Sequence, residues 1–168
     1  ATDNALFYHD FEERFRGPQQ EIVERLRQYL PCIQKQFGTL QNKVCADIGC
    51  GRGEWLDLLR EQGVQEYVGI ALNTLQLEIC KQKGHPVICQ DAVQYIAQQP
   101  EGSLDLITGF QIIEHLSFET LLALFAVCFK ALRPGGAVLF ETPNTTNLQT
   151  GATYFYADPT HIKPLFKG

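Results

Sequence analysis

Three alternating glycines follow an acidic residue at the end of an apolar run, and this segment is well suited to bind a ligand. It extends from Val44 to Trp55 with the sequence VCADIGCGRGEW. Glycine has no Cβ, so Gly49, Gly51 and Gly53 allow the backbone to turn sharply and approach a ligand. The free amide groups of a helix that begins here favour a polar or negatively charged ligand group. The G-x-G-x-G spacing is one residue shorter than the dinucleotide-binding G-x-G-x-x-G, which disfavours a nicotinamide cofactor.

The chain around this loop alternates between predicted strands and helices. Strands are expected at 43–48, 67–71, 86–90, 104–109 and 136–142, and helices at 53–62, 74–83, 92–98 and 118–132. Such alternation predicts an α/β fold, in which helices cover both faces of a parallel sheet. We expect Ser117 to cap the last helix, and Pro134-Gly135-Gly136 to turn the chain into the last strand.

The composition indicates one globular domain without a nucleic-acid-binding surface. The 168 residues are 45% hydrophobic and 20% charged, with a net charge of -5. Phosphate binding needs clustered Lys and Arg, so nucleic acid is not an expected partner. No apolar run reaches the roughly 20 residues that cross a bilayer, and no signal pattern is present, so a cytoplasmic location is expected. The six cysteines form no C-x-x-C pair and are expected to be reduced, mostly buried thiols.

The glycine loop and the segments after it resemble class I S-adenosylmethionine (SAM) methyltransferases over roughly residues 40–145. The further matching segments are Cys89-Gln90-Asp91-Ala92, Phe110-Gln111 and Leu132-Arg133-Pro134-Gly135-Gly136. The resemblance implies a Rossmann-like sheet with SAM as cofactor at its edge, where open α/β folds bind ligands. It also implies which residues hold SAM: Asp47, Gly49, Gly51 and Gly53 at the methionine moiety, Asp91 and Ala92 at adenine, and Gln111 near the methyl group.

One position departs from that family's pattern. The second strand should end in an Asp or Glu that binds both ribose hydroxyls, but Ala71 occupies this position. Asn73 follows two residues later and is expected to recover part of the contact. Weak SAM binding, or a lost or altered use of the cofactor, would follow.

A closer resemblance involves motifs outside the cofactor loop. They are Phe7-Tyr8, Phe11-Glu12, Arg14-Phe15-Arg16-Gly17, Ile113-Glu114-His115-Leu116, Glu141-Thr142-Pro143-Asn144 and Asp158-Pro159-Thr160-His161. Together they are similar to bacterial methyltransferases of O-antigen and other surface polysaccharides, including domains fused to kinases or glycosyltransferases. This resemblance implies lipopolysaccharide biosynthesis, with a sugar hydroxyl or a terminal phosphate of a glycan as the methyl acceptor.

The chain is expected to divide into three parts. Residues 1–38 would form an N-terminal lid and an extra helix at 18–37, with a kink at Pro31. Residues 39–145 would form the SAM-binding core, and residues 146–168 a truncated loop on the acceptor side. A complete class I sheet adds a helix and two strands after Thr142, so the C-terminal strands are expected to be missing here.

The acceptor side contains the candidate catalytic residues. A phosphate acceptor needs no base, whereas a sugar hydroxyl needs one, and His115 and His161 are the candidates, with Glu114 beside them. The alternatives are a capping or packing role for His115 and a surface position for His161. These residues also resemble E-x-x-E-H metal sites of some other methyltransferases. Those sites have a carboxylate at the position of Gln111, so no metal is predicted.

Two residues of the N-terminal segment complete the predicted cofactor site. Tyr8 would close over SAM as part of the lid, and Arg16 would bind the SAM carboxylate or an acceptor phosphate. The alternative for Arg16 is a solvated charge paired with a nearby glutamate. At the level of function the alternatives are a degenerate methyltransferase fold that serves as a scaffold or sensor, and, less favoured, a nucleotide-dependent oxidoreductase.

Overall fold

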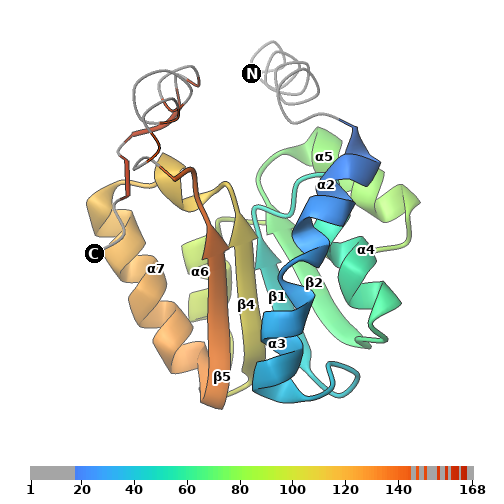
Figure 1. Ribbon diagram of the computed structural model, residues 1–168. Coiled ribbons are helices and arrows are strands. Elements are labelled where there is room, and N and C mark those ends of the chain that lie inside the picture. The colour runs from blue at the N-terminus through green and yellow to red at the C-terminus, as the bar shows by residue number, and fades with distance from the viewer. Residues whose placement is uncertain are drawn as a thin grey trace.

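A single parallel sheet of five strands forms the centre of the domain (Figure 1). The computed structural model describes residues 18–144, 147, 150, 155, 158, 160–162 and 164–165. The strands are β1 (Val44–Ile48), β2 (Glu66–Ala71), β3 (Val87–Cys89), β4 (Leu104–Phe110) and β5 (Leu132–Glu141). They lie in the order β3-β2-β1-β4-β5, and every neighbouring pair is parallel. The predicted α/β fold is therefore confirmed.

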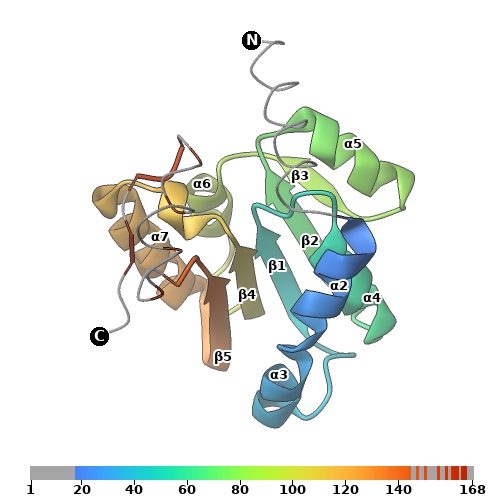
Figure 2. The same cartoon turned by 45° about the horizontal axis from the view of Figure 1, so that its top comes forward.

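Helices cover both faces of this sheet (Figure 2). One face packs against α2 (Gln19–Arg27), α3 (Leu30–Phe37), α4 (Glu54–Glu61) and α5 (Thr74–Gln82). The other packs against α6 (Ala92–Ala97) and α7 (Phe118–Ala131). Alternate residues of a strand point to opposite faces, so Cys45 and Leu106 enter the first core, while Ala46 and Ile107 enter the second. In the described part of the chain, no helix has the length and apolar character needed to span a membrane.

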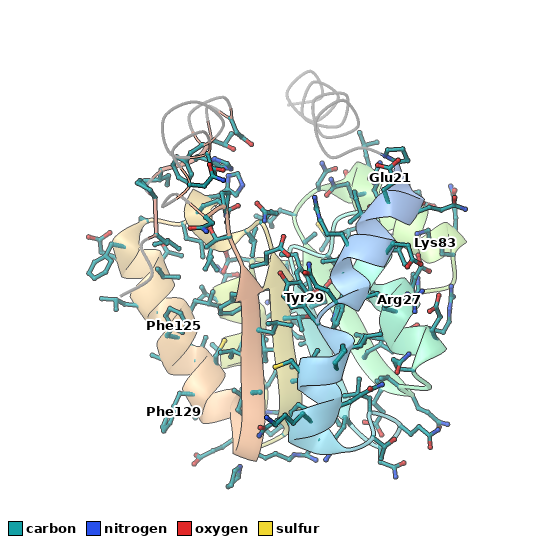
Figure 3. All side chains as sticks on the ribbon, in the orientation of Figure 1. Glu21, Arg27, Tyr29, Lys83, Phe125 and Phe129 are labelled. Carbon is teal, nitrogen blue, oxygen red and sulfur yellow. The ribbon has the colours of Figure 1, made fainter. Side chains whose placement is uncertain are left out.

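The N-terminal helix differs from the prediction of one kinked helix. The chain forms two helices, and the break lies at Gln28 and Tyr29, ahead of Pro31. Proline lacks a backbone N–H, so it is tolerated in the first turn of α3 but not inside a continuous helix. Tyr29 lies at this junction (Figure 3), and its ring packs against Phe110 with centroids 5.7 Å apart. The break thus places a tyrosine hydroxyl near the carboxyl end of the sheet.

Strand β5 begins earlier than predicted, at Leu132 rather than residue 136. Leu104 pairs with Leu132, but Leu106 already pairs with Ala137, so the extra residues between them bulge out of the ladder. Gly135 has φ +83° within this bulge, a conformation that suits glycine. The predicted turn is therefore present as an irregularity inside the strand. As predicted, Ser117 caps α7, because its hydroxyl accepts a hydrogen bond from the amide of Thr120 at 3.1 Å.

Candidate cofactor and acceptor site

A cavity of about 410 Å³ opens at the carboxyl ends of β1, β2 and β4. Its lining comes from the glycine loop, the end of β2, the start of α6, and the short 3₁₀ helix η1 (Ile113–His115) with its neighbours. Sites for small molecules occupy roughly 300–1,000 Å³, and open α/β sheets bind ligands at this edge. The size and the position of the cavity both fit a small-molecule ligand.

The glycine loop has the backbone conformation that the sequence predicts. Gly49 has φ +66° and Gly51 has φ +54°, and both line the cavity. A Cβ on Gly49 would lie 3.0 Å from the side chain of Ile112, which lines the same cavity. Glycine is required here for the backbone angle and for the close approach of Ile112, the residue that precedes η1.

Gly53, which the resemblance placed at the methionine moiety, does not line the large cavity. It precedes α4 with φ +84°, and a Cβ there would meet Cys80 at 3.1 Å and His85 at 3.2 Å. Its conformation serves the entry into the helix and the packing behind the loop.

Asp47 and Gln111 border a second cavity of about 30 Å³ on the other side of the glycine loop. Asp47 is 2% exposed and accepts a hydrogen bond from the hydroxyl of Thr108 on β4 at 2.7 Å, which ties the end of β1 to β4. Gln111 lines both cavities with φ +56°, an unusual angle for a residue other than glycine. Its amide Nε2 donates to Glu141 at 2.8 Å, which holds it in this strained conformation.

Glu141 also accepts a hydrogen bond from the hydroxyl of Tyr29 at 2.5 Å. Burial and this hydrogen bond raise the pKa of Tyr29 to about 12, so the phenol keeps its proton. Neither Tyr29 nor Glu141 was predicted as a site residue. The N-terminal helices carried no ligand-binding pattern, and only the break before Pro31 turns Tyr29 toward the sheet edge.

The residues predicted at the adenine and ribose line the large cavity, but two of them also cap helices. Asp91 accepts a hydrogen bond from the amide of Gln94 at 3.0 Å and so begins α6, with Ala92 beside it. The side-chain oxygen of Asn73 accepts from the amide of Leu75 at 3.1 Å and begins α5. That oxygen is engaged by the helix, and a contact between Asn73 and the ribose stays a prediction. Ala71 itself lines the cavity.

The structure brings the three predicted acceptor-side residues together. The potential ligand atoms of Glu114, His115 and His161 all lie within 4.8 Å of one another. The two imidazole rings meet edge to face with centroids 4.7 Å apart, and Glu114 is 1% exposed. The backbone amide of Ile162 donates to the carbonyl of Glu114 at 3.0 Å, which fastens the C-terminal segment to η1. His115 lines the large cavity, whereas Glu114 and His161 lie behind it.

Two residues without a predicted role hold this group in place. Thr160 lies in the cavity wall, and its hydroxyl contacts Nδ1 of His115 at 2.8 Å and the Asp158 carboxylate at 2.5 Å. The motif Asp158-Pro159-Thr160-His161 was noted in the sequence, but local spacing does not show which histidine the threonine reaches. Tyr8 and Arg16, the remaining predicted cofactor residues, lie outside the described residues.

A cluster of polar side chains behind the glycine loop centres on the buried His85. His85 Nε2 donates to Asp57 at 2.9 Å, so the lone pair of Nδ1 accepts from the hydroxyl of Tyr67 at 3.0 Å. Burial lowers the pKa of His85 below its usual 6.5, and the nearby charges of Arg60 and Lys83 act in the same direction, against the Asp57 contact. Burial tends to raise the pKa of Asp57, but hydrogen bonds from Lys83 and His85 hold it below 3.8.

We expect the domain to lose thermal stability as the pH falls below about 6.5, because the unfolded chain then binds a proton at His85 that the folded chain resists. Above that pH the histidine is neutral in both states and the loss vanishes. Thermal unfolding followed between pH ~7 and ~5 measures the effect, with His85→Gln as the matched variant. An equally steep decline in His85→Gln would assign the pH dependence to other groups.

Comparison with known proteins identifies the fold. A family described as "Methyltransferase domain" matches residues 16–166, nearly the whole chain. The chain belongs to this family. A crystal structure of a SAM-dependent methyltransferase from Archaeoglobus fulgidus is 35% identical, with a TM-score of 0.85 over 95% of this chain and 68% of that chain. The phosphoethanolamine N-methyltransferase 1 of Haemonchus contortus, 21% identical with a TM-score of 0.60 over 83% of this chain and 32% of that chain, shares the fold.

Among curated proteins, the methyltransferase domain is similar to two enzymes named ubiquinone biosynthesis O-methyltransferase. Those of Nitrosococcus oceani and Idiomarina loihiensis are each 30% identical over 117 residues, which is 67% of this chain. The chain spans about half the length of these relatives, 48% and 47%. Neither these names nor the solved structures mention a surface glycan, so the specific resemblance to O-antigen enzymes gains no support from them.

SAM is the cofactor of this methyltransferase domain, and the residues present fit it. The large cavity has Asp91 and Ala92 at one part of its wall and the glycine loop at another, and Gly49 connects it to the small cavity. There, the indole Nε1 of Trp55 is buried and has no hydrogen-bond partner among the described residues. A buried N–H group without a partner is unfavourable, so this indole N–H would gain from a hydrogen bond to an acceptor such as the SAM carboxylate. The one mismatch is Ala71 at the position of the ribose-binding acid.

Proposed function

We propose that this methyltransferase domain transfers the SAM methyl group to a hydroxyl oxygen, specifically a sugar hydroxyl of a bacterial surface glycan. The observation that carries the proposal is the cluster of Glu114, His115 and His161 beside the cavity. A hydroxyl must lose its proton when it is methylated, and an imidazole lone pair can take that proton or hold a cation that promotes its release. A hydroxyl acceptor needs such a cluster to remove its proton, whereas an acceptor that is already anionic needs no base.

The charges around the cavity also favour a hydroxyl over a phosphate. Among the described residues that line the cavity, none is Lys or Arg, whereas Asp91 is acidic. Phosphate recognition relies on Arg or Lys side chains. The names of the relatives support an oxygen acceptor as well, since both are O-methyltransferases. The sugar, rather than an aromatic ring, is proposed from the sequence motifs around Glu114 and His161.

In the proposed reaction, SAM would supply a methyl group that is bonded to its positively charged sulfur. The acceptor oxygen would attack this methyl group in line with the carbon–sulfur bond, and the sulfur would leave. The glycine loop, Asp91 and Gln111 position the cofactor, and this alignment supplies much of the acceleration. Thr160 fixes the ring of His115 in the cavity wall, where this ring would lie beside the acceptor. Glu114 and His161 lie next to that ring, with side-chain N or O atoms within 4.8 Å of it.

The test is methyl transfer by the full-length protein to three classes of acceptor. A glycan with free terminal hydroxyls, the same glycan with a terminal phosphate, and an aromatic diol are each incubated with SAM, and the demethylated cofactor is measured. We expect the demethylated cofactor to form with the glycan that has free terminal hydroxyls, and we expect His115→Gln to lose this turnover. Transfer to the phosphate or the aromatic diol alone would overturn the proposed acceptor. Binding of SAM without transfer to any acceptor would favour the alternative of a scaffold domain. That alternative is suggested by the alanine at position 71, where the family's pattern has an acidic residue.

A further inference from the structure

We propose that Tyr29 and Glu141 are positioning residues for the cofactor, because they fix the side-chain amide of Gln111 beside the sulfonium group of SAM. Tyr29 lies at the junction of α2 and α3, Glu141 ends β5, and Gln111 follows the last residue of β4. The three side chains thus join the N-terminal helices to the edge of the sheet. Their role concerns binding of the cofactor and does not depend on which acceptor receives the methyl group.

Gln111 lies where the two cavities meet. It lines the cavity of about 410 Å³, whose wall also contains Asp91 and His115, and the cavity of about 30 Å³, whose wall also contains Trp55. Among the described residues, only Gly49 shares this double position. SAM has adenosine at one end and an amino-acid carboxylate at the other, with the sulfonium group between them. With adenosine in the large cavity and the carboxylate near Trp55, the sulfonium group would lie beside Gln111.

The hydrogen bonds of Gln111 determine the orientation of its side-chain amide. Its Nε2 donates to Oε1 of Glu141 at 2.8 Å, and an ionised carboxylate can only accept. The amide nitrogen therefore lies toward Glu141, and the amide oxygen is directed away from it. The backbone amide of Gln111 also donates to the carbonyl of Glu141 at 2.8 Å, so the residue is held at two points. Since Gln111 lines the large cavity and Glu141 does not, the amide oxygen is the atom that can face the sulfonium group.

Tyr29 holds the second oxygen of the same carboxylate. Its hydroxyl donates to Oε2 of Glu141 at 2.5 Å, and the raised pKa of Tyr29, about 12, keeps the donated proton on the phenol. Its ring also packs against Phe110, the residue before Gln111, with centroids 5.7 Å apart. Both oxygens of Glu141 are thus engaged, and the carboxylate cannot turn away without losing a hydrogen bond.

The backbone of Gln111 favours a role in binding over packing alone. Its φ of +56° is the only positive φ of a non-glycine residue in the described part of the chain. Such a conformation is strained, and strained residues are found mainly at ligand-binding and catalytic sites. The carbons bonded to the sulfonium carry part of its positive charge, so their hydrogens interact favourably with an amide oxygen through C–H···O contacts. The demethylated product has a neutral sulfur and lacks the methyl group, so it would gain less from the same oxygen.

The experiment is a calorimetric titration with SAM and with its demethylated product, on the parent, Tyr29→Phe and Glu141→Gln. Tyr29→Phe keeps the ring and removes only the hydroxyl, and should lower the ratio of SAM affinity to product affinity by roughly two- to fivefold, the effect of one C–H···O contact. Glu141→Gln should lower the ratio further, because it also removes a negative charge close to the sulfonium group. The same two substitutions in the Ala71→Asp background keep the ratio measurable where the parent affinity is low.

Tyr67→Phe is the matched control. It also removes a hydrogen-bonded phenol hydroxyl, which lies 3.0 Å from Nδ1 of His85, but Tyr67 lines neither cavity. It should lose some thermal stability and keep the parent affinity ratio. Product affinity close to the parent value, with a cooperative thermal transition, shows that each variant is folded.

An unchanged affinity ratio in Tyr29→Phe, or an equal loss of affinity for both ligands, would overturn the proposal. Absence of SAM binding in the Ala71→Asp background would overturn it as well. No methyl acceptor is present in these titrations, so a wrong acceptor in the proposed function would leave their result unaffected.

Discussion

Replacing Gly49 with alanine is expected to reduce SAM affinity by at least about tenfold. The residue has φ +66°, where a Cβ costs roughly 1–2 kcal/mol, and the new methyl group would lie 3.0 Å from Ile112. Both the loop and η1 must move to relieve this contact, and both line the cavity. A loss of about 1.4 kcal/mol in binding free energy corresponds to a tenfold weaker affinity. Calorimetric titration with SAM and with its demethylated product measures the effect.

Gly102→Ala is the matched control for this variant. Gly102 also has a positive φ, +64°, but it precedes β4 at the opposite edge of the sheet, and a Cβ there has its nearest neighbour at 3.7 Å. The control should lose some thermal stability because of its backbone angle, and should keep the parent affinity for SAM. Unchanged SAM affinity in Gly49→Ala would contradict the assignment of the cavity as the cofactor site. An equal loss in Gly102→Ala would attribute the effect to general destabilisation.

Replacing Ala71 with aspartate is expected to strengthen SAM binding by about 10- to 150-fold. Ala71 ends β2 and lines the cavity, and the oxygen of Asn73 nearby is engaged by the amides of α5. A carboxylate at this position can accept hydrogen bonds from both ribose hydroxyls, and such bonds to a charged acceptor contribute roughly 1.5–3 kcal/mol. The measurement is again calorimetry with SAM and its demethylated product, on both the parent and the variant.

Ala71→Asn is the matched control, because asparagine has nearly the shape of aspartate but no charge. It should gain less SAM affinity than Ala71→Asp. Binding by the aspartate variant alone, with none by the parent, would favour a degenerate domain that has lost its cofactor. Equal affinity of parent and Ala71→Asp would show that other residues already hold the ribose. Gln76 is the candidate for that role, because it lines the cavity and is buried in the first turn of α5.

The sequence was sufficient to predict the α/β fold and the position of the cofactor loop, since both depend on local patterns. Strands bury every second residue and helices bury one face, so the alternation of β1 to β5 with their helices is visible in the order of residues. The positive φ angles at Gly49 and Gly51 follow from glycine itself. The bulge in β5 and the break before Pro31 were missed in detail, because each depends on how the segment packs against the sheet.

Only the tertiary structure decided which polar groups are available to a ligand. Asp91 and Asn73, both predicted as cofactor residues, also cap helices through one side-chain oxygen each, because helix N-termini need acceptors. Similarly, the sequence contains Glu114-His115 and His161 far apart, and it cannot show that the backbone of Ile162 pairs with Glu114 and closes the cluster. Residue types and local periodicity are properties of the chain, whereas the meeting of distant groups depends on the path of the folded backbone.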